Sequence, residues 1–184
     1  LGPLIGDQPA VVAASTREGE EELVLDAFSG VLATGRALRL VLAPRHAERS
    51  GEVARLAAQR GLSVLLWTQA GQAHTGDRPD WEVLVIDSVG ELRGFMKAAL
   101  GVFVGGTLVP VGGHNLLEPA AFGLPVAAGP HLANVAYQAG PLSENEALAP
   151  VEDAEDLCRV WSDWLDRPEA AKAAGLRALE VVES

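Results

Sequence analysis

The sequence has little cysteine, little positive charge and no long apolar run, and each shortage excludes a class of protein. Its single cysteine, Cys158, cannot form an internal disulfide, and the apolar helical pattern around it predicts a buried structural thiol. Lysine and arginine number 14 against 25 aspartates and glutamates, and the net charge of -11 argues against an extended nucleic-acid interface. No stretch of about 18 apolar residues is present to cross a bilayer. The first residues also lack signal-peptide features, so we expect a soluble cytoplasmic domain without a nucleic-acid partner.

The usual motifs for metals, dinucleotides and nucleoside triphosphates are missing too. Four histidines, His46, His74, His114 and His131, are scattered, with no H-x-x-x-H spacing and no cysteine pair. No D-x-D element, no G-x-G-x-x-G fingerprint and no Walker loop occurs. We therefore expect no metal and no cofactor, and we expect any ligand phosphate to meet helix termini and Arg45 instead.

What the sequence does contain is a regular alternation of short apolar runs and amphipathic stretches. The runs are apolar on both faces, as the strands of a parallel sheet require, and the stretches between them have helical periodicity. Strands are expected at Ala10 to Ala14, Leu38 to Ala43, Ser63 to Leu66, Val83 to Ile86, Val102 to Val104 and Val126 to Ala128, helices at Glu20 to Leu32, Glu52 to Arg60, Asp153 to Leu165 and from Pro168 onward, and a mobile surface loop at Trp67 to Trp81. The predicted fold is one domain over 1–184, a doubly wound, Rossmann-like α/β sheet of about six parallel strands. Such sheets bind ligands beyond the carboxyl ends of their strands.

Polar residues follow the first two predicted strands at this edge. Ser15 and Thr16 lie between the first strand and the first helix. Either hydroxyl could cap the helix, with a following glutamate completing a capping box, or it could help the free helix N–H groups to hold a ligand anion. Arg45 and His46 follow the second strand. Arginine offers a planar fork for phosphate or carboxylate, whereas an isolated loop histidine is usually solvated.

A second polar turn follows the strand at Val83 to Ile86. Ser88 could cap the next helix and Glu91 could close a capping box. The backbone groups of Val89, Gly90 and Glu91 could also grip the edge of a nucleobase. The two interpretations are compatible.

The strand at Val102 to Val104 leads into the stretch richest in glycine. Two pairs, Gly105-Gly106 and Gly112-Gly113, bracket a short loop, and glycine lets a backbone approach a ligand more closely than any Cβ allows. Glu118 follows one turn into the next expected helix. Its carboxylate could accept hydrogen bonds from the two hydroxyls of a ribose, or it could simply be solvated.

Several of these segments together resemble one protein family. The segment from Glu118 to Val126 resembles the E-x-x-A-x-G-x-P-V element of GT-B donor domains, which is shared broadly. Four other segments, in this order and spacing, are similar to Kdo (3-deoxy-D-manno-octulosonic acid) transferases. They are Ala14 to Glu21 (ASTREGEE), Pro44 to Arg49 (PRHAER), Gly105 to Asn115 (GGTLVPVGGHN) and Gly129 to His131 (GPH). The resemblance covers the chain from about Pro9 onward.

This resemblance implies an inverting, metal-independent glycosyltransferase that moves Kdo from CMP-Kdo to a lipid A precursor in lipopolysaccharide biosynthesis. By resemblance, the donor-binding residues are Ser15, Thr16, Arg45, His46, Val89, Gly90, Glu91, Gly112, Gly113, His114, Asn115 and Glu118. Arg45 would meet the anionic groups, the turn at Val89 to Glu91 would border cytosine, and Glu118 would hold the ribose. The four residues from Gly112 to Asn115 would cradle phosphate and sugar.

The same resemblance implies that this chain is the C-terminal donor-binding half only. The family's N-terminal domain carries the general base, the acceptor site and the membrane-proximal segment, so we expect no catalytic residue here and no turnover by this chain alone. The parent enzyme is expected at the cytoplasmic face of the inner membrane. Two alternatives stay open, a donor domain that uses a UDP-sugar and a non-catalytic nucleotide-binding module.

Overall fold

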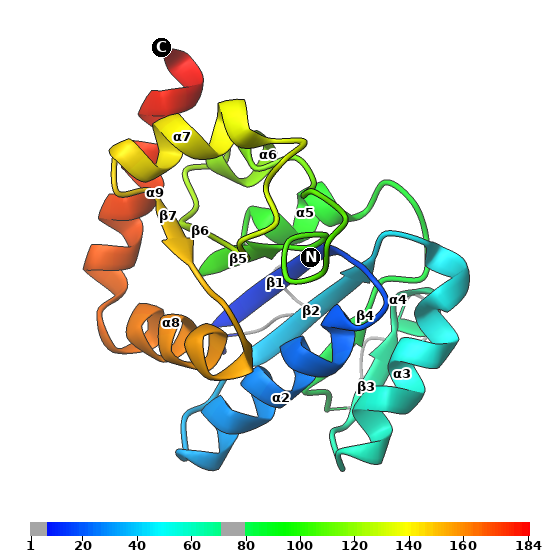
Figure 1. Ribbon diagram of the computed structural model, residues 1–184. Coiled ribbons are helices and arrows are strands. Elements are labelled where there is room, and N and C mark those ends of the chain that lie inside the picture. The colour runs from blue at the N-terminus through cyan, green and yellow to red at the C-terminus, as the bar shows by residue number, and fades with distance from the viewer. Residues whose placement is uncertain (1–6, 71–79) are drawn as a thin grey trace.

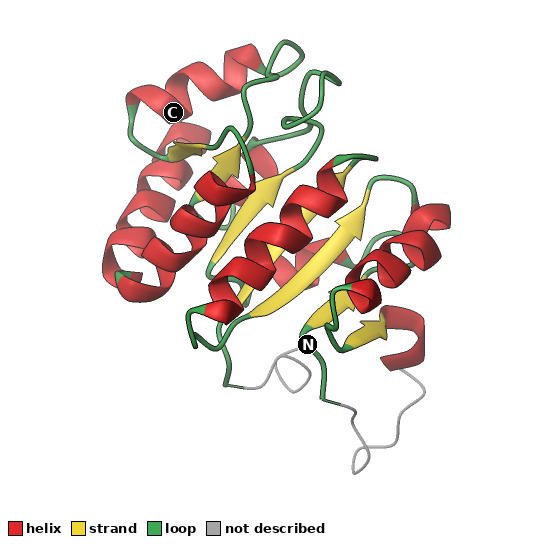
Figure 2. Cartoon of the chain, turned by 60° about the horizontal axis from the view of Figure 1, so that its bottom comes forward, coloured by secondary structure: helices red, strands yellow, loops and turns green. Residues whose placement is uncertain are grey.

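The computed structural model describes residues 7–70 and 80–184 and shows a parallel sheet of seven strands with helices on both faces (Figures 1 and 2). The strand order is β3-β4-β2-β1-β5-β6-β7, and every neighbouring pair is parallel. The strands are β1 (Ala10–Thr16), β2 (Arg39–Pro44), β3 (Val64–Leu66), β4 (Val83–Val85), β5 (Gly101–Val104), β6 (Val126–Ala128) and β7 (Leu148–Pro150). The doubly wound fold predicted from the sequence is confirmed.

The helices pack against the sheet in two groups because successive strand residues face opposite sides. Within β1, Val12 belongs to a core formed with α5, α6 and α7, whereas Val11 belongs to a core formed with α2, α3 and α8. Helix α9 contributes Ala178 to the first core and Ala171 to the second. The helices are α2 (Glu20–Ala33), α3 (Ser50–Gln59), α4 (Trp67–Ala70), α5 (Leu92–Met96), α6 (Leu117–Ala120), α7 (Ala136–Glu144), α8 (Ala154–Asp166) and α9 (Pro168–Glu183), with a 3-10 turn η1 (Ala47–Arg49).

Several details differ from the sequence expectations. The seventh strand, β7, was not predicted, because its three residues Leu-Ala-Pro end in an exposed proline at the sheet edge and form no apolar run. Cys158 is half-buried rather than buried.

The expected loop from Trp67 to Trp81 starts with helix α4, and Trp81 at its other end is buried, with 3% of its surface exposed. Asp87 stabilises the start of α4, since its carboxylate accepts from the backbone N–H of Thr68 at 2.9 Å and from its hydroxyl at 2.5 Å. The rest of that loop, residues 71–79, lies outside the described residues. In the described ranges, no helix has both the length and the hydropathy that crossing a bilayer requires.

Candidate functional site

The order of the strands makes β1 and β5 the topological switch point of the sheet, and we call the region beyond their carboxyl ends the crevice. From β1 the chain runs outward to β2, β3 and β4, and it then returns to the other side of β1 to form β5. At such a switch point α/β proteins bind ligands beyond the carboxyl ends of the strands. Gly105 lets the two loops meet, since a Cβ at this position would lie 2.6 Å from the carbonyl oxygen of Ser15 and from the Cα of Thr16.

Ser15 occupies a backbone conformation that non-glycine residues rarely adopt. Its φ is 56°, and the register of β1 against β2 shifts between Ala14 and Thr16. A left-handed serine costs roughly 1–3 kcal/mol, which the surrounding structure has to offset, and such strain is concentrated at functional sites. Ser15 lines a pocket with residues at the end of β2 and in the loops after β2 and β4, namely Pro44, Arg45, Ser88, Val89 and Gly90 among others. Three segments predicted from the sequence as site segments therefore converge.

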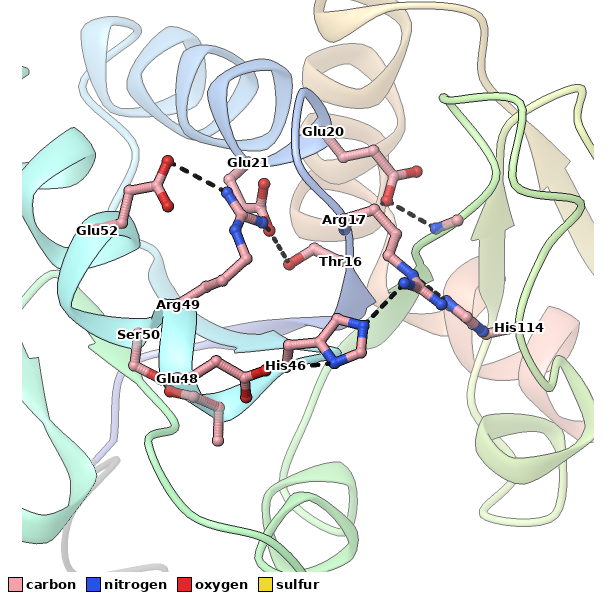
Figure 3. Close-up of polar contacts among 12 residues, drawn as sticks. Thr16, Arg17, Glu20, Glu21, His46, Glu48, Arg49, Ser50, Glu52 and His114 are labelled. Atoms are coloured by element: carbon pink, nitrogen blue, oxygen red, sulfur yellow. Dashed lines mark hydrogen bonds and ion pairs between the residues drawn. The ribbon is translucent and has the colours of Figure 1, made fainter.

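Next to Ser15, an arginine joins two histidines from distant parts of the chain (Figure 3). Arg17 donates from Nε to Nε2 of His114 at 3.1 Å and from Nη1 to Nε2 of His46 at 2.9 Å. Because a guanidinium only donates, both rings present an unprotonated Nε2 to it. The pKa of His114 is lowered, first by burial and then by the positive charges of Arg17 and Arg45. Both rings are thus fixed beside a permanent cation.

Arg45 adds a second cation to this group. It is exposed, and its guanidinium makes no hydrogen bond or ion pair with the described part of the chain. Arg17, Arg45, His46 and His114 form what we call the cationic cluster. Sequence reasoning selected three of these residues but missed Arg17, whose two contacts span 97 and 29 residues of sequence.

The glycine loop after β5 is held by a buried carboxylate that sequence reasoning considered only for capping. Glu20 is 0% exposed and accepts hydrogen bonds from the backbone N–H groups of Gly106, Thr107 and Leu108 at 2.6, 2.9 and 2.8 Å. It also accepts from the backbone N–H of Arg17 at 2.9 Å. Glu20 therefore fixes both loops of the crevice relative to each other.

The sequence suggested that serine or threonine caps a helix at two places, and this prediction is wrong at both. Helix α2 begins at Glu20, after a Gly19 with φ 87°, so Ser15 and Thr16 lie too far upstream to cap it. Helix α5 begins at Leu92, and its N-cap position is Glu91 without a side-chain cap, so Ser88 is not the cap. Gly90, in the turn just before α5, has a left-handed φ of 98°.

A buried ion pair supports the loop that carries Arg45 and His46. Arg49 donates to Oε1 of Glu21 at 2.8 Å, and the hydroxyl of Thr16 donates to the same oxygen at 3.2 Å. Glu21 is 0% exposed, and burial raises its pKa while Arg49 opposes the rise. Thr16 is 1% exposed, so its hydroxyl points into the interior rather than toward the pocket.

Close packing against neighbouring side chains explains why glycine occupies both positions of the second pair, Gly112 and Gly113. Gly112 and Gly113 have φ of 100° and 90°, and a Cβ on them would lie 2.5 Å from Nδ2 of Asn134 and 2.7 Å from Cγ2 of Val135. Asn115 accepts from the N–H of Leu117 at 3.0 Å. That these residues also cradle a ligand stays a prediction.

Glu118 forms an ion pair with Arg93. Nε of Arg93, which follows the pocket residue Leu92, donates to its Oε1 at 3.0 Å. The side chain of Glu118 is 31% exposed and that of Arg93 is 73% exposed, so both remain accessible. Chemically, the crevice offers cations for an anion and a carboxylate for hydroxyl groups. In the described residues no three His, Cys, Asp or Glu side chains are grouped to hold a metal ion.

Two known proteins are similar to this chain over nearly its whole length. The crystal structure of the C-terminal CMP-Kdo binding domain of WaaA from Acinetobacter baumannii superposes with a TM-score of 0.87 and 30% identity, covering 98% of this chain and 92% of that one. A 3-deoxy-D-manno-octulosonic acid transferase of Haemophilus influenzae is 35% identical over 179 residues, which are 96% of this chain. The chain spans 40% of that curated relative.

More distant structures share the fold alone. A glycosyltransferase from Rickettsia africae matches with a TM-score of 0.67 at 15% identity, over 97% of this chain and 43% of that protein. No family model matches the sequence. Because a 30% identical domain is matched over nearly its whole length, this chain belongs to the 3-deoxy-D-manno-octulosonic acid (Kdo) transferase family and corresponds to the family's C-terminal domain.

Proposed function

We propose that this chain is the donor-binding domain of a Kdo transferase and that it binds CMP-Kdo at the crevice between β1 and β5. The observation that carries the proposal is the convergence of the pocket at Ser15, Arg45 and Val89 with the cationic cluster. A nucleotide sugar that contains one phosphate and one carboxylate needs cations beside a pocket for its base. The similarity to a CMP-Kdo binding domain over almost the whole chain supports this choice of donor.

Each part of the donor has a partner in this proposal. Arg45 and Arg17 meet the phosphate and the sugar carboxylate, the backbone of Val89, Gly90 and Glu91 borders the cytosine, and Glu118 accepts from the ribose hydroxyls. Arg93 holds the Glu118 carboxylate in place for that contact. As the bond from the sugar to the phosphate breaks, negative charge grows on CMP, and the guanidinium groups of Arg17 and Arg45 stabilise it in the transition state.

The acceptor and the general base belong, in this proposal, to another part of a longer enzyme. The chain matches 40% of its Haemophilus relative, which leaves room there for a second domain that binds the lipid A precursor at the cytoplasmic face of the inner membrane. Membrane contact would then come through that domain. This chain alone would bind the donor without turnover.

Calorimetric titration with CMP and with UMP tests the proposal. We expect CMP to bind more tightly, and we expect Arg45→Ala and Glu118→Ala each to weaken CMP binding by about tenfold, equivalent to 1.4 kcal/mol. Arg55→Ala is the matched control, since Arg55 is exposed on α3 and, among the described residues, its side chain hydrogen-bonds just to the carbonyl oxygen of Gly51 in its own helix. Preferential binding of UMP would favour a UDP-sugar donor, and binding of neither nucleotide would contradict the proposal.

A further inference from the structure

Glu20 places a carboxylate of the protein where α/β proteins often hold a phosphate of their ligand. Three consecutive backbone N–H groups, of Gly106, Thr107 and Leu108, point at its two oxygens. Successive N–H groups that converge in this way form an anion-binding nest. The nest lies at the carboxyl end of β5, the switch-point position at which a ligand anion is expected.

The carboxylate fills this nest completely. Glu20 is 0% exposed, and with the N–H of Arg17 it accepts four hydrogen bonds, the number a carboxylate can readily accommodate. Among the described residues, no lysine or arginine side chain forms an ion pair with it. All four of these hydrogen bonds come from backbone N–H groups, in the manner in which a bound phosphate would be held.

The nest and the cationic cluster share a boundary. A Cβ on Gly106 would lie 2.9 Å from the ring of His114, so that ring packs directly against the residue whose N–H binds Glu20. Arg17 contacts Glu20 through its backbone and His114 through its side chain, and Figure 3 shows the three side by side. A ligand phosphate at the cluster therefore lies next to a buried negative charge, and a second phosphate would find neighbouring N–H donors already occupied.

We propose that Glu20 is a specificity-determining residue that fills the backbone anion nest and so restricts the donor site to ligands with a single phosphate. This inference rests on the proposed binding of a CMP-sugar. The carboxylate both withholds three N–H donors and repels a second phosphate electrostatically, so nucleoside diphosphates are disfavoured. Glu20 acts without touching the ligand itself.

The test is the ratio of the dissociation constants for CDP and CMP, measured by calorimetry on the wild type, Glu20→Gln and Glu20→Ala. The wild type is expected to bind CMP more tightly. Glu20→Gln removes the negative charge with little change in shape, and Glu20→Ala removes the charge and also empties the nest. The dissociation constant for CDP divided by that for CMP should therefore fall in both variants, and by about tenfold in Glu20→Ala. Glu21→Gln, which removes the adjacent buried carboxylate outside the nest, should leave the ratio unchanged.

A ratio matters here because a merely structural role of Glu20 would weaken CMP and CDP binding alike. Circular dichroism identifies the folded variants, and if Glu20→Ala does not fold, Glu20→Gln decides. A ratio that stays within about threefold of the wild type in the folded variants overturns the inference but leaves the proposed function intact. Absence of CMP binding by the wild type overturns both.

Discussion

The buried pair of Glu21 and Arg49 makes a quantitative prediction about stability. Replacing Arg49 by methionine keeps most of the side-chain volume but leaves Glu21, 0% exposed, without its cation. Removing one partner of a buried pair typically costs 3–5 kcal/mol. Because the side chain of Arg49 retains 18% exposure, we expect the lower end, about 3 kcal/mol at pH 8. For a chain of this length that corresponds to a fall in Tm of roughly 6–12 °C.

The cost of Arg49→Met should also depend on pH. Burial already raises the pKa of Glu21 in the folded protein, and loss of Arg49 removes the main opposing influence. A carboxyl with a raised folded pKa binds protons more readily folded than unfolded, so the folded state loses stability as pH rises from the ordinary value of 4.5 through the folded pKa. The deficit of Arg49→Met should therefore shrink between pH 8 and pH 5.

Urea denaturation followed by the fluorescence of the buried Trp161 and Trp164 measures both effects. The double variant Glu21→Gln/Arg49→Met is the control, since it removes the buried charge as well as its partner. It should recover at least about half of the lost free energy. A cost below about 1 kcal/mol for Arg49→Met, or a double variant as unstable as the single one, would refute the reasoning.

Two further predictions concern the loops of the crevice. Burial and nearby arginines lower the pKa of His114, so the folded protein loses stability as pH falls from 6.5 through that lowered pKa. In His114→Gln the Tm measured by thermal unfolding should lose this part of its pH dependence. Identical profiles of Tm against pH below pH 6.5 for the wild type and the variant would contradict this prediction. Gly112→Ala should destabilise by roughly 1–3 kcal/mol, because a left-handed residue with Asn134 at 2.5 Å must strain or move. Gly51 lies on α3 with open space around it, so Gly51→Ala should instead stabilise the folded protein by roughly 0.5–1 kcal/mol. Urea titrations compare the two variants, and equal changes in their free energies of unfolding would show that the conformation of Gly112 is unimportant.

The sequence predicted the sheet well because its central strands are apolar on both faces. Runs such as Leu38 to Ala43 have few alternatives to a buried strand, and they correspond to β2 with a shift of one residue at each end. The short edge strand β7 carries no such signal, since a strand of three residues at the rim is held by its pairing with β6 rather than by its own composition.

The candidate site was predictable in its location but not in its contacts. Segments after parallel strands meet at one edge, and this rule brought Ser15 and Arg45 together as expected. The roles of Arg17 and Glu20 depend on side-chain contacts with His46, His114 and the glycine loop, which lie 29 to 97 residues away in the sequence. Local patterns described Glu20 only as a residue of a helix start, because nothing nearby encodes the loop N–H groups that it binds.

The contacts of Arg17 also determine whether its side-chain entropy is lost during folding or during ligand binding. A free arginine side chain has about 2 kcal/mol of rotamer entropy to lose when it becomes ordered. In this protein two histidines already fix the guanidinium, so that loss occurs during folding rather than when a ligand arrives. Its other N–H groups have no partner among the described residues and keep a set direction. An anion entering the crevice thus meets an arginine whose conformation is already selected.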